Sequence, residues 1–333
     1  MLFRNLSTYC LFMPIIAFAE NKTTDVIKPS LAPFTTNANN AHPDAPKFQP
    51  YGINYAIYHK SFNNSSSLDD DEAAIEGHYS LRYAFYDCRR GKETEWNSCD
   101  NDSTKKLTVF FSFTGEFDFY VGTRHSGPVI NRTSNPALHF YTLLSDKERL
   151  LGIDFLDVAL EHRSNGQATE IYEKNEEGRL KTQAAYFNGD HEYFDSISRG
   201  ANYLSFAVGT DSLKNKFNWK ASFKAYITNS TAINWGKLAS KDVDIKDYDL
   251  VRIAASYKHD GKNFLSGVTY GAEYTFGKEF FDTDSLELML MKDFLIGNFT
   301  LPLMLKVHLG PMKTLSNYTQ SVTSVGFGLV LNF

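Results

Sequence analysis

A histidine and a serine two residues apart, His162 and Ser164, end a stretch in which apolar and polar residues alternate. Read as a β-strand, the stretch sends alternate side chains to opposite faces. One face then carries Leu156, Val158, Leu160, His162 and Ser164. Polar groups at the end of an apolar face are costly unless they are used. An imidazole beside a hydroxyl can act as a base that activates a nucleophile, so the pair is a candidate catalytic centre.

A second alternating stretch begins with Asn202, which shares a face with Leu204, Phe206 and Val208. If the two stretches are neighbouring strands, Asn202 meets His162, and its carbonyl oxygen can hold the imidazole in one tautomer. A neutral amide suits such a face, because an ionised carboxylate against lipid would be several kcal/mol less favourable. The backbone N–H of Gly166, just after Ser164, could donate to a developing oxyanion.

Alternation of this kind continues to the end of the chain and predicts about twelve strands. The chain is 42% apolar, yet no apolar run after the N-terminus is long enough for an ordinary membrane-spanning helix. Charged residues fall on the second face of strand after strand, as a polar lumen needs, and connections alternate between short and long. The last strand can close onto the first and remove the sheet edges. We therefore expect an all-β, antiparallel transmembrane barrel, with a soluble sandwich or open barrel as the alternative.

The N-terminal segment of the chain suggests export. Residues 1–19 have the form of a signal peptide, with an A-x-A cleavage site at 17–19. A buried first strand is the alternative interpretation of that segment. Residues 20–50 are interpreted as a periplasmic tail and residues 51–333 as the barrel. Export places Cys88 and Cys99 in an oxidising compartment, where a disulfide between them would close a long turn.

Composition and motifs also indicate what the chain does not bind. The formal net charge of −5 is mild and gives no case for nucleic acid. A glycine-rich phosphate cradle that follows a strand and opens a helix is not found in the sequence, so a nucleotide site is not expected.

The residues around this centre resemble a known family. The segment His162-Arg163-Ser164-Asn165-Gly166, followed by residues 198–202 (Ser-Arg-Gly-Ala-Asn), is similar to motifs of outer membrane phospholipase A from Gram-negative bacteria. Residues 47–58, 111–114, 126–136 and 325–332 also resemble that family, in the same order. The resemblance covers roughly residues 45–333, and it implies a twelve-stranded, calcium-dependent barrel in the cell outer membrane.

The resemblance implies a role for each residue of the centre. Ser164 would attack an acyl ester of a phospholipid or lysophospholipid, His162 would be general base and then acid, and Asn202 would orient it. Calcium would lie near the oxyanion site. Its ligands would be the side-chain oxygens of Asp195 and Ser198, the backbone carbonyl of Gln167, and the hydroxyl of Ser126 from a partner subunit of a calcium-dependent homodimer.

Two departures from the family pattern stand out. The segment between Gly166 and Asp195 is much longer than in the family, and its acidic residues are best interpreted as solvated loop charge. Where the family has a Thr-Gln pair on its third strand, with the glutamine at its dimer contact, this chain has Thr114-Gly115. The dimer contact through that glutamine is therefore not expected here.

Two further functions are compatible with the same strands. One is a passive barrel, either a porin or a structural protein, which the alternation and charged lumen alone would support. The other is a soluble secreted hydrolase that keeps the three polar residues without a membrane. Ion conductance would distinguish the first, and recovery without detergent would distinguish the second.

Overall fold

The computed structural model describes residues 48–62, 73–87, 106–120, 129–144, 152–167, 180–181, 184–185, 188, 190, 193, 195–210, 216–227, 237–238, 241–242, 244–259, 265–278, 283–297, 299–316 and 318–331. The expected signal peptide, both cysteines of the expected disulfide, and Ser126 lie outside these residues. Within the described part of the chain, none of the helices is long and apolar enough to cross a membrane.

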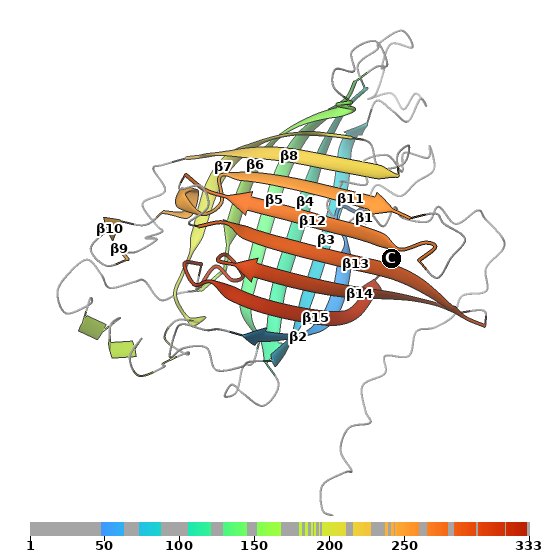
Figure 1. Cartoon of the computed structure of the whole chain (residues 1–333). Coiled ribbons are helices and arrows are strands. Elements are labelled where there is room, and N and C mark those ends of the chain that lie inside the picture. The colour runs from blue at the N-terminus through green and yellow to red at the C-terminus, as the bar shows by residue number, and fades with distance from the viewer. Residues whose placement is uncertain are drawn as a thin grey trace, which may run out of the picture.

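The chain forms a closed antiparallel barrel of 12 strands (Figure 1). These strands are β2 (Asn54–Phe62), β3 (Ala73–Asp87), β4 (Lys106–Tyr120), β5 (Val129–Leu143), β6 (Phe155–Ser164), β7 (Gly200–Gly209), β8 (Phe217–Tyr226), β11 (Val251–Lys258), β12 (Thr269–Phe276), β13 (Ser285–Ile296), β14 (Phe299–Gly310) and β15 (Val322–Leu331). β15 pairs with β2, from Thr323↔Phe62 to Leu331↔Asn54. The predicted fold class and the closure of the last strand onto the first are therefore confirmed.

Four short elements accompany these twelve strands in the described part of the chain. β9 (Lys237–Leu238) and β10 (Lys241–Asp242) form a separate two-stranded ribbon, and η2 (Ile245–Asp247) is one turn of 3-10 helix before β11. β1 (Phe48–Pro50) pairs with β3, from Phe48↔Tyr83 to Pro50↔Leu81. β1 continues the line of β2 along β3, so the wall starts at Phe48, inside the segment that the sequence assigned to the tail.

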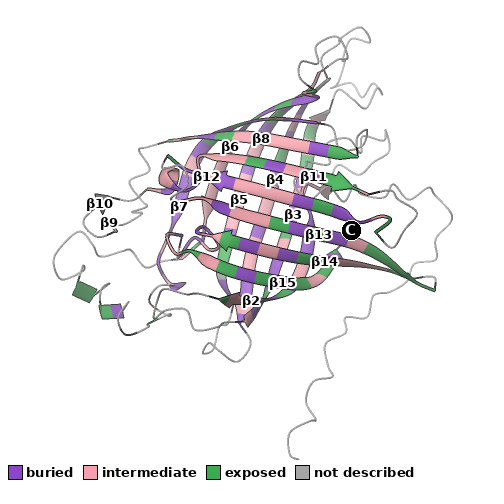
Figure 2. Cartoon of the chain, in the orientation of Figure 1, coloured by how far each residue is buried: buried purple, intermediate pink, exposed green. Residues whose placement is uncertain are grey.

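The two faces of the wall differ as a period of two requires (Figure 2). Large apolar side chains are exposed on the outer face; Leu160 is 49% exposed and Phe327 is 55% exposed. Polar residues on the inner face are buried, and Lys306 is only 7% exposed. An apolar outside around a polar inside is the arrangement of a barrel that contacts hydrocarbon.

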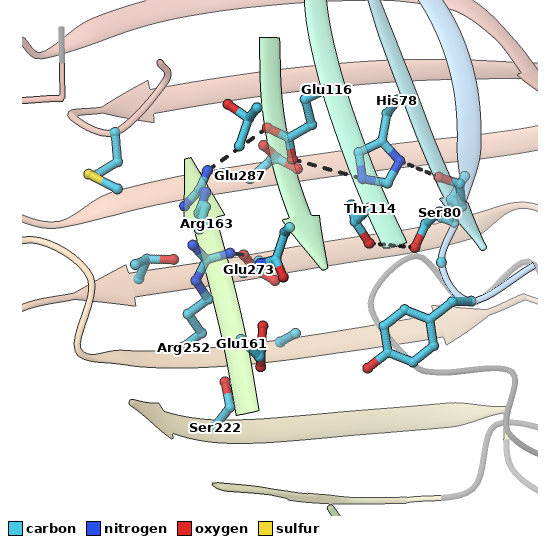
Figure 3. A pocket seen from close by; sticks show the side chains of 18 of the residues that line it. His78, Ser80, Thr114, Glu116, Glu161, Arg163, Ser222, Arg252, Glu273 and Glu287 are labelled. Carbon is cyan, nitrogen blue, oxygen red and sulfur yellow. Dashed lines mark hydrogen bonds and ion pairs between the residues drawn. The ribbon is translucent and has the colours of Figure 1, made fainter. Parts of the chain in front are cut away.

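Ion pairs cross the inside of the barrel. Lys306 Nζ lies 2.7 Å from Glu76 Oε1 and 3.1 Å from Glu287 Oε2, joining β14 to β3 and β13. Lys313, from the β14–β15 loop, pairs with the other oxygen of Glu76. A cavity of about 310 Å³ remains among these groups (Figure 3). Buried charges need such partners, because an unpaired charge away from water is strongly unfavourable.

Apolar clusters lie within the barrel near each end of the strands. We call the end with Phe48 and Leu331 the proximal end and the opposite one the distal end. Proximally, Phe110, Tyr141 and Phe155 pack together with Tyr51, Ala84 and Leu143. Distally, the packed residues are Ala201, Tyr203, Ile245, Tyr248, Met312, Leu315 and Tyr318. The distal cluster joins the η2 segment and the β14–β15 loop to the start of β7.

A fully buried carboxylate, Asp249, ties three strands together at the distal end. Its Oδ2 lies 2.7 Å from Lys224 Nζ, 2.6 Å from Arg252 and 3.3 Å from Arg163. Burial alone would raise the pKa of Asp249, but the charges of Arg252, Lys224 and Arg163 outweigh it and hold the pKa well below its usual range. The carboxylate thus stays ionised and links β6, β8 and β11.

We expect Asp249→Asn to destabilise the barrel by about 3–5 kcal/mol, because it leaves three cations together without their counter-charge. The unfolding midpoint of the refolded protein in urea would measure this loss. The depressed pKa means that the contribution is complete above the unfolded-state pKa of about 4 and is lost as the pH falls below it. The variant should therefore approach wild-type stability at low pH; a constant gap would contradict this assignment.

Candidate active site

His162 and Ser164 lie at the distal end of β6, the last residues of its outer stripe. Leu156, Val158 and Leu160 on that stripe are exposed, whereas Asp157 and Ala159 between them are buried. His162 and Ser164 are half-buried. Glu161 and Arg163, on either side of His162, make contacts inside the barrel, so His162 and Ser164 share the outer face, as predicted.

Asn202 stands directly opposite His162. β6 and β7 pair from Phe155↔Gly209 to Ser164↔Gly200, and this register contains His162↔Asn202. The imidazole Nδ1 lies 2.7 Å from Asn202 Oδ1. Because an amide oxygen only accepts, Nδ1 carries the proton, and Nε2 is left with its lone pair. The imidazole is therefore held in the tautomer that can take a proton at Nε2.

The Ser164 hydroxyl is on the same face but stands apart from the ring. Within the described residues, no hydrogen bond links Ser164 Oγ to His162. Such bonds are often long without substrate and tighten when it binds. Across the ladder, Ser164 faces Ser134 of β5, and neither hydroxyl makes a hydrogen bond within the described part of the chain.

The other flank of His162 is an interrupted ladder. Pairing of β5 with β6 passes from Ser134↔Ser164 to Ala137↔Glu161 and leaves out the two residues between. One of them is Pro136, which has no N–H to donate. The strand that carries the base is thus held at this level mainly by β7.

Behind the centre, the inward side chains of β6 make polar contacts. Glu161 accepts a hydrogen bond from Tyr203 Oη at 3.1 Å and another from Ser205 Oγ. Asp157 Oδ2 lies 2.9 Å from His139 Nδ1. Both acids therefore point into the lumen, where the charge of Lys224 also acts on Glu161. Arg163, between His162 and Ser164, is directed inward and reaches Glu116 at 3.9 Å (Figure 3).

Gly166 turns the chain away from the wall just after the serine. Its φ is +61°, a left-handed conformation that favours glycine, and open space surrounds the position of a Cβ atom. Its neighbour Asn165 is buried, and sequence reasoning assigned it no role of its own. Its place in the motif could have drawn attention to it, because an amide side chain that directly follows the candidate nucleophile can both donate and accept hydrogen bonds.

The expected calcium ligands begin where this turn ends. Gln167 and Ser198 are half-buried and Asp195 is 9% exposed. A backbone carbonyl, a hydroxyl and a carboxylate are the hard oxygen ligands that calcium prefers. The N–H of Gln167 donates to Asn165 Oδ1 at 3.4 Å, and Ser198 lies between Ile197 and Arg199, which also bond to Asn165. The fold therefore brings both ends of this loop together.

A different cluster of potential ligands lies inside the barrel. The ligand atoms of His59, Glu76 and Asp118 are within 4.8 Å of one another. Glu76 is already paired with Lys306 and Lys313, and His59 Nε2 lies 3.2 Å from Asp118. The ammonium groups of Lys306 and Lys313 already neutralise Glu76 and would repel a metal ion, so we interpret this cluster as a salt-bridge network.

Comparison with known proteins gives structural matches. No protein-family model and no curated protein sequence matches the chain. An active-site mutant of outer membrane phospholipase A from Escherichia coli matches with a TM-score of 0.56 and 16% identity, over 87% of this chain and 93% of that one. The Escherichia coli enzyme itself matches with a TM-score of 0.56 and 15% identity, over 92% of this chain and 98% of that one.

A third solved structure is the outer membrane phospholipase of Salmonella typhi, a dimer with bound calcium. It has the same TM-score of 0.56, with 15% identity, over 92% of this chain and 98% of that one. Likeness at such low identity reports the course of the backbone. The chain has the barrel fold of outer membrane phospholipase A.

Proposed function

We propose that this protein is a phospholipase of the outer membrane that hydrolyses the acyl esters of phospholipids and lysophospholipids. The observation that carries the proposal is the 2.7 Å contact between His162 and Asn202, on the outer face beside Ser164. A cluster of polar groups on a largely apolar face needs a purpose. A lipid ester at the membrane boundary would reach them sideways, without entering the lumen.

The chemistry follows from the tautomer. With Nδ1–H bound to Asn202, the free Nε2 takes the proton of Ser164 as its Oγ attacks the ester carbonyl. His162 then returns that proton to the leaving alcohol, and water releases the acyl group by the same steps. The backbone N–H of Gly166 is the donor that we assign to the tetrahedral oxyanion. Asn202 steadies the imidazolium between these transfers.

Calcium belongs to the proposal as a cofactor. Gln167, through its carbonyl, and Asp195 and Ser198, through their side chains, would hold it beside the turn at Gly166. A bound calcium ion would supply positive charge to stabilise the developing oxyanion. Ser126 of a second copy is the fourth ligand that we propose. The solved Salmonella relative is a calcium-bound dimer, which supports this part.

A dimer of this chain would need a contact other than the family's glutamine. Gly115 of β4 lies under the ring of Tyr79, and an ideal Cβ at Gly115 would be 2.2 Å from that ring. A glutamine there would displace Tyr79, which also stacks on Phe113. In the proposed calcium-dependent homodimer, each subunit would therefore contact its partner through the aromatic rings of Tyr79 and Phe113 at this level of β4.

The two alternative functions lack comparable support. In a passive channel, ions would have to pass the Glu76–Lys306–Lys313 network and the apolar clusters near both ends. A soluble hydrolase would expose side chains such as Phe206, which is 45% exposed, and Phe327 to water. A large apolar surface of that kind marks contact with a membrane or a partner.

We expect Ser164→Ala to fold but to lose at least about 10³-fold in turnover of a defined phospholipid in detergent. Ser134→Ala is the matched control, since it removes a hydroxyl from the facing residue on the same outer wall. That variant should keep activity within a few-fold of wild type. Equal lysolipid release by wild type and Ser164→Ala would end the proposal.

Asn202→Ala should lower kcat by about 10²-fold, because the imidazole loses its orienting partner while the base and nucleophile remain. Its KM for phospholipid should stay near that of wild type, since the amide binds the imidazole and not the lipid. Steady-state kinetics in mixed micelles would separate the two constants. A changed KM with an unchanged kcat would show that Asn202 binds substrate instead.

Removal of calcium by a chelator should abolish hydrolysis, and added calcium should restore it. Asp195→Asn and Ser198→Ala should each raise the calcium concentration needed for half-maximal activity. As a readout independent of turnover, calcium should raise the unfolding temperature of wild type more than that of either variant. Full activity in the chelator would remove calcium from the proposal and leave the serine mechanism standing.

A further inference from the structure

The residue after the proposed nucleophile, Asn165, is 1% exposed and uses its whole amide. Its Oδ1 accepts from the N–H of Arg199 at 2.9 Å and from the N–H of Gln167 at 3.4 Å. Its Nδ2 donates to the carbonyl of Ile197 at 2.7 Å and to Ser316 Oγ at 3.3 Å. An amide has two lone pairs and two N–H groups, so no hydrogen-bonding capacity remains.

These bonds continue the β6–β7 pairing beyond its last register pair. The ladder ends at Ser164↔Gly200, and the N–H of Asn165 then donates to the carbonyl of Arg199 at 3.0 Å. Beyond that point, the Asn165 side chain supplies the hydrogen bonds to residues 197–199, which lead into β7. The long segment between Gln167 and Asp195 thus leaves and returns beside one buried amide.

The β14–β15 loop, residues 311–321, closes over this junction. Ser316, which bonds to Asn165, is 3% exposed, and the ring of Tyr318 lies 5.1 Å from the guanidinium carbon of Arg199. Burial raises the pKa of the Tyr318 hydroxyl above its ordinary value. Lys313 of the same loop is anchored to Glu76 in the lumen. The junction is therefore packed from the distal end as well as bonded within the wall.

We propose that Asn165 is a positioning residue for the reaction at Ser164. It fixes the Gly166 N–H on one side of the serine and residues 197–199 on the other, so that the oxyanion donor and Ser198 keep their distances from the attacking oxygen. The inference rests on the proposed hydrolase function and assigns it a further residue. Displacement of reacting groups by about 1 Å can lower a rate by about 10²-fold, which is the effect that such a residue prevents.

The first test is Asn165→Ala, assayed at saturating calcium in detergent. We expect kcat to fall by about 10²-fold while KM stays within about 2-fold of wild type. The rate constant for covalent modification of Ser164 by an alkyl fluorophosphonate should fall in parallel. A merely structural role would lower the fraction of protein that reacts, and not the rate constant of the folded fraction.

The second test is Asn165→Asp, which keeps the acceptor for Arg199 but sets an oxygen against the Ile197 carbonyl. Two oxygens then face each other without a proton between them, which is unfavourable in a buried position. We expect kcat and the modification rate constant of this variant to fall at least as far as those of Asn165→Ala, with KM again within about 2-fold of wild type.

The matched control is Asn54→Ala at the proximal end. Asn54 is 3% exposed, and its Oδ1 accepts from the N–H of Ser80 at 2.6 Å. This variant should lose stability while keeping the kcat and modification rate constant of wild type. Wild-type values in Asn165→Ala, or equal losses in both asparagine variants, would overturn the inference. A wild-type protein that the fluorophosphonate does not modify at Ser164 would instead overturn the proposed function.

Discussion

The antiparallel register of β6 with β7 is the constraint on which the candidate site depends. It places Asn202 opposite His162, and a shift of one residue would turn the partner of the imidazole to the inside of the barrel. The register is fixed by more than backbone bonds. Glu161 binds Tyr203 and Ser205 across the same pair of strands on the inner face, so the lumenal contacts and the outer contact enforce one alignment.

The inner network also explains how polar groups persist on an apolar wall. Arg163 stands between His162 and Ser164 and points inward to Asp249, which gathers Lys224 and Arg252 as well. These contacts hold the distal end of β6 at a level where Pro136 interrupts the ladder with β5. An imidazole that keeps one orientation on an outer face needs a strand with little freedom. The charges inside therefore support the geometry outside.

The period of two was enough to predict the closed barrel and the faces of His162, Ser164 and Asn202. Alternation fixes a face without reference to distant residues, which is why these predictions are confirmed. The partners of Glu161 and Asp157 were not predictable in the same way. Cations, hydroxyls and imidazoles all face inward among the described residues, so polarity alone does not say which of them an acid meets. The pattern alone put Phe48–Pro50 in the tail, because a three-residue strand has no period to detect, whereas the family resemblance at residues 47–58 includes it.

The role of Asn165 was not predicted, because its hydrogen-bond partners are distant in the sequence. Its burial comes partly from Ser316, 151 residues later, and its bonds to Ile197 and Arg199 span a long segment of different composition. An insertion next to a nucleophile would ordinarily loosen it, because each added residue brings conformational freedom. Here both ends of the insertion meet at one saturated amide, whose hydrogen bonds hold the residues on the site's side of the junction. The segment after Gly166 can therefore differ in length without changing the positions of His162, Ser164 and Asn202.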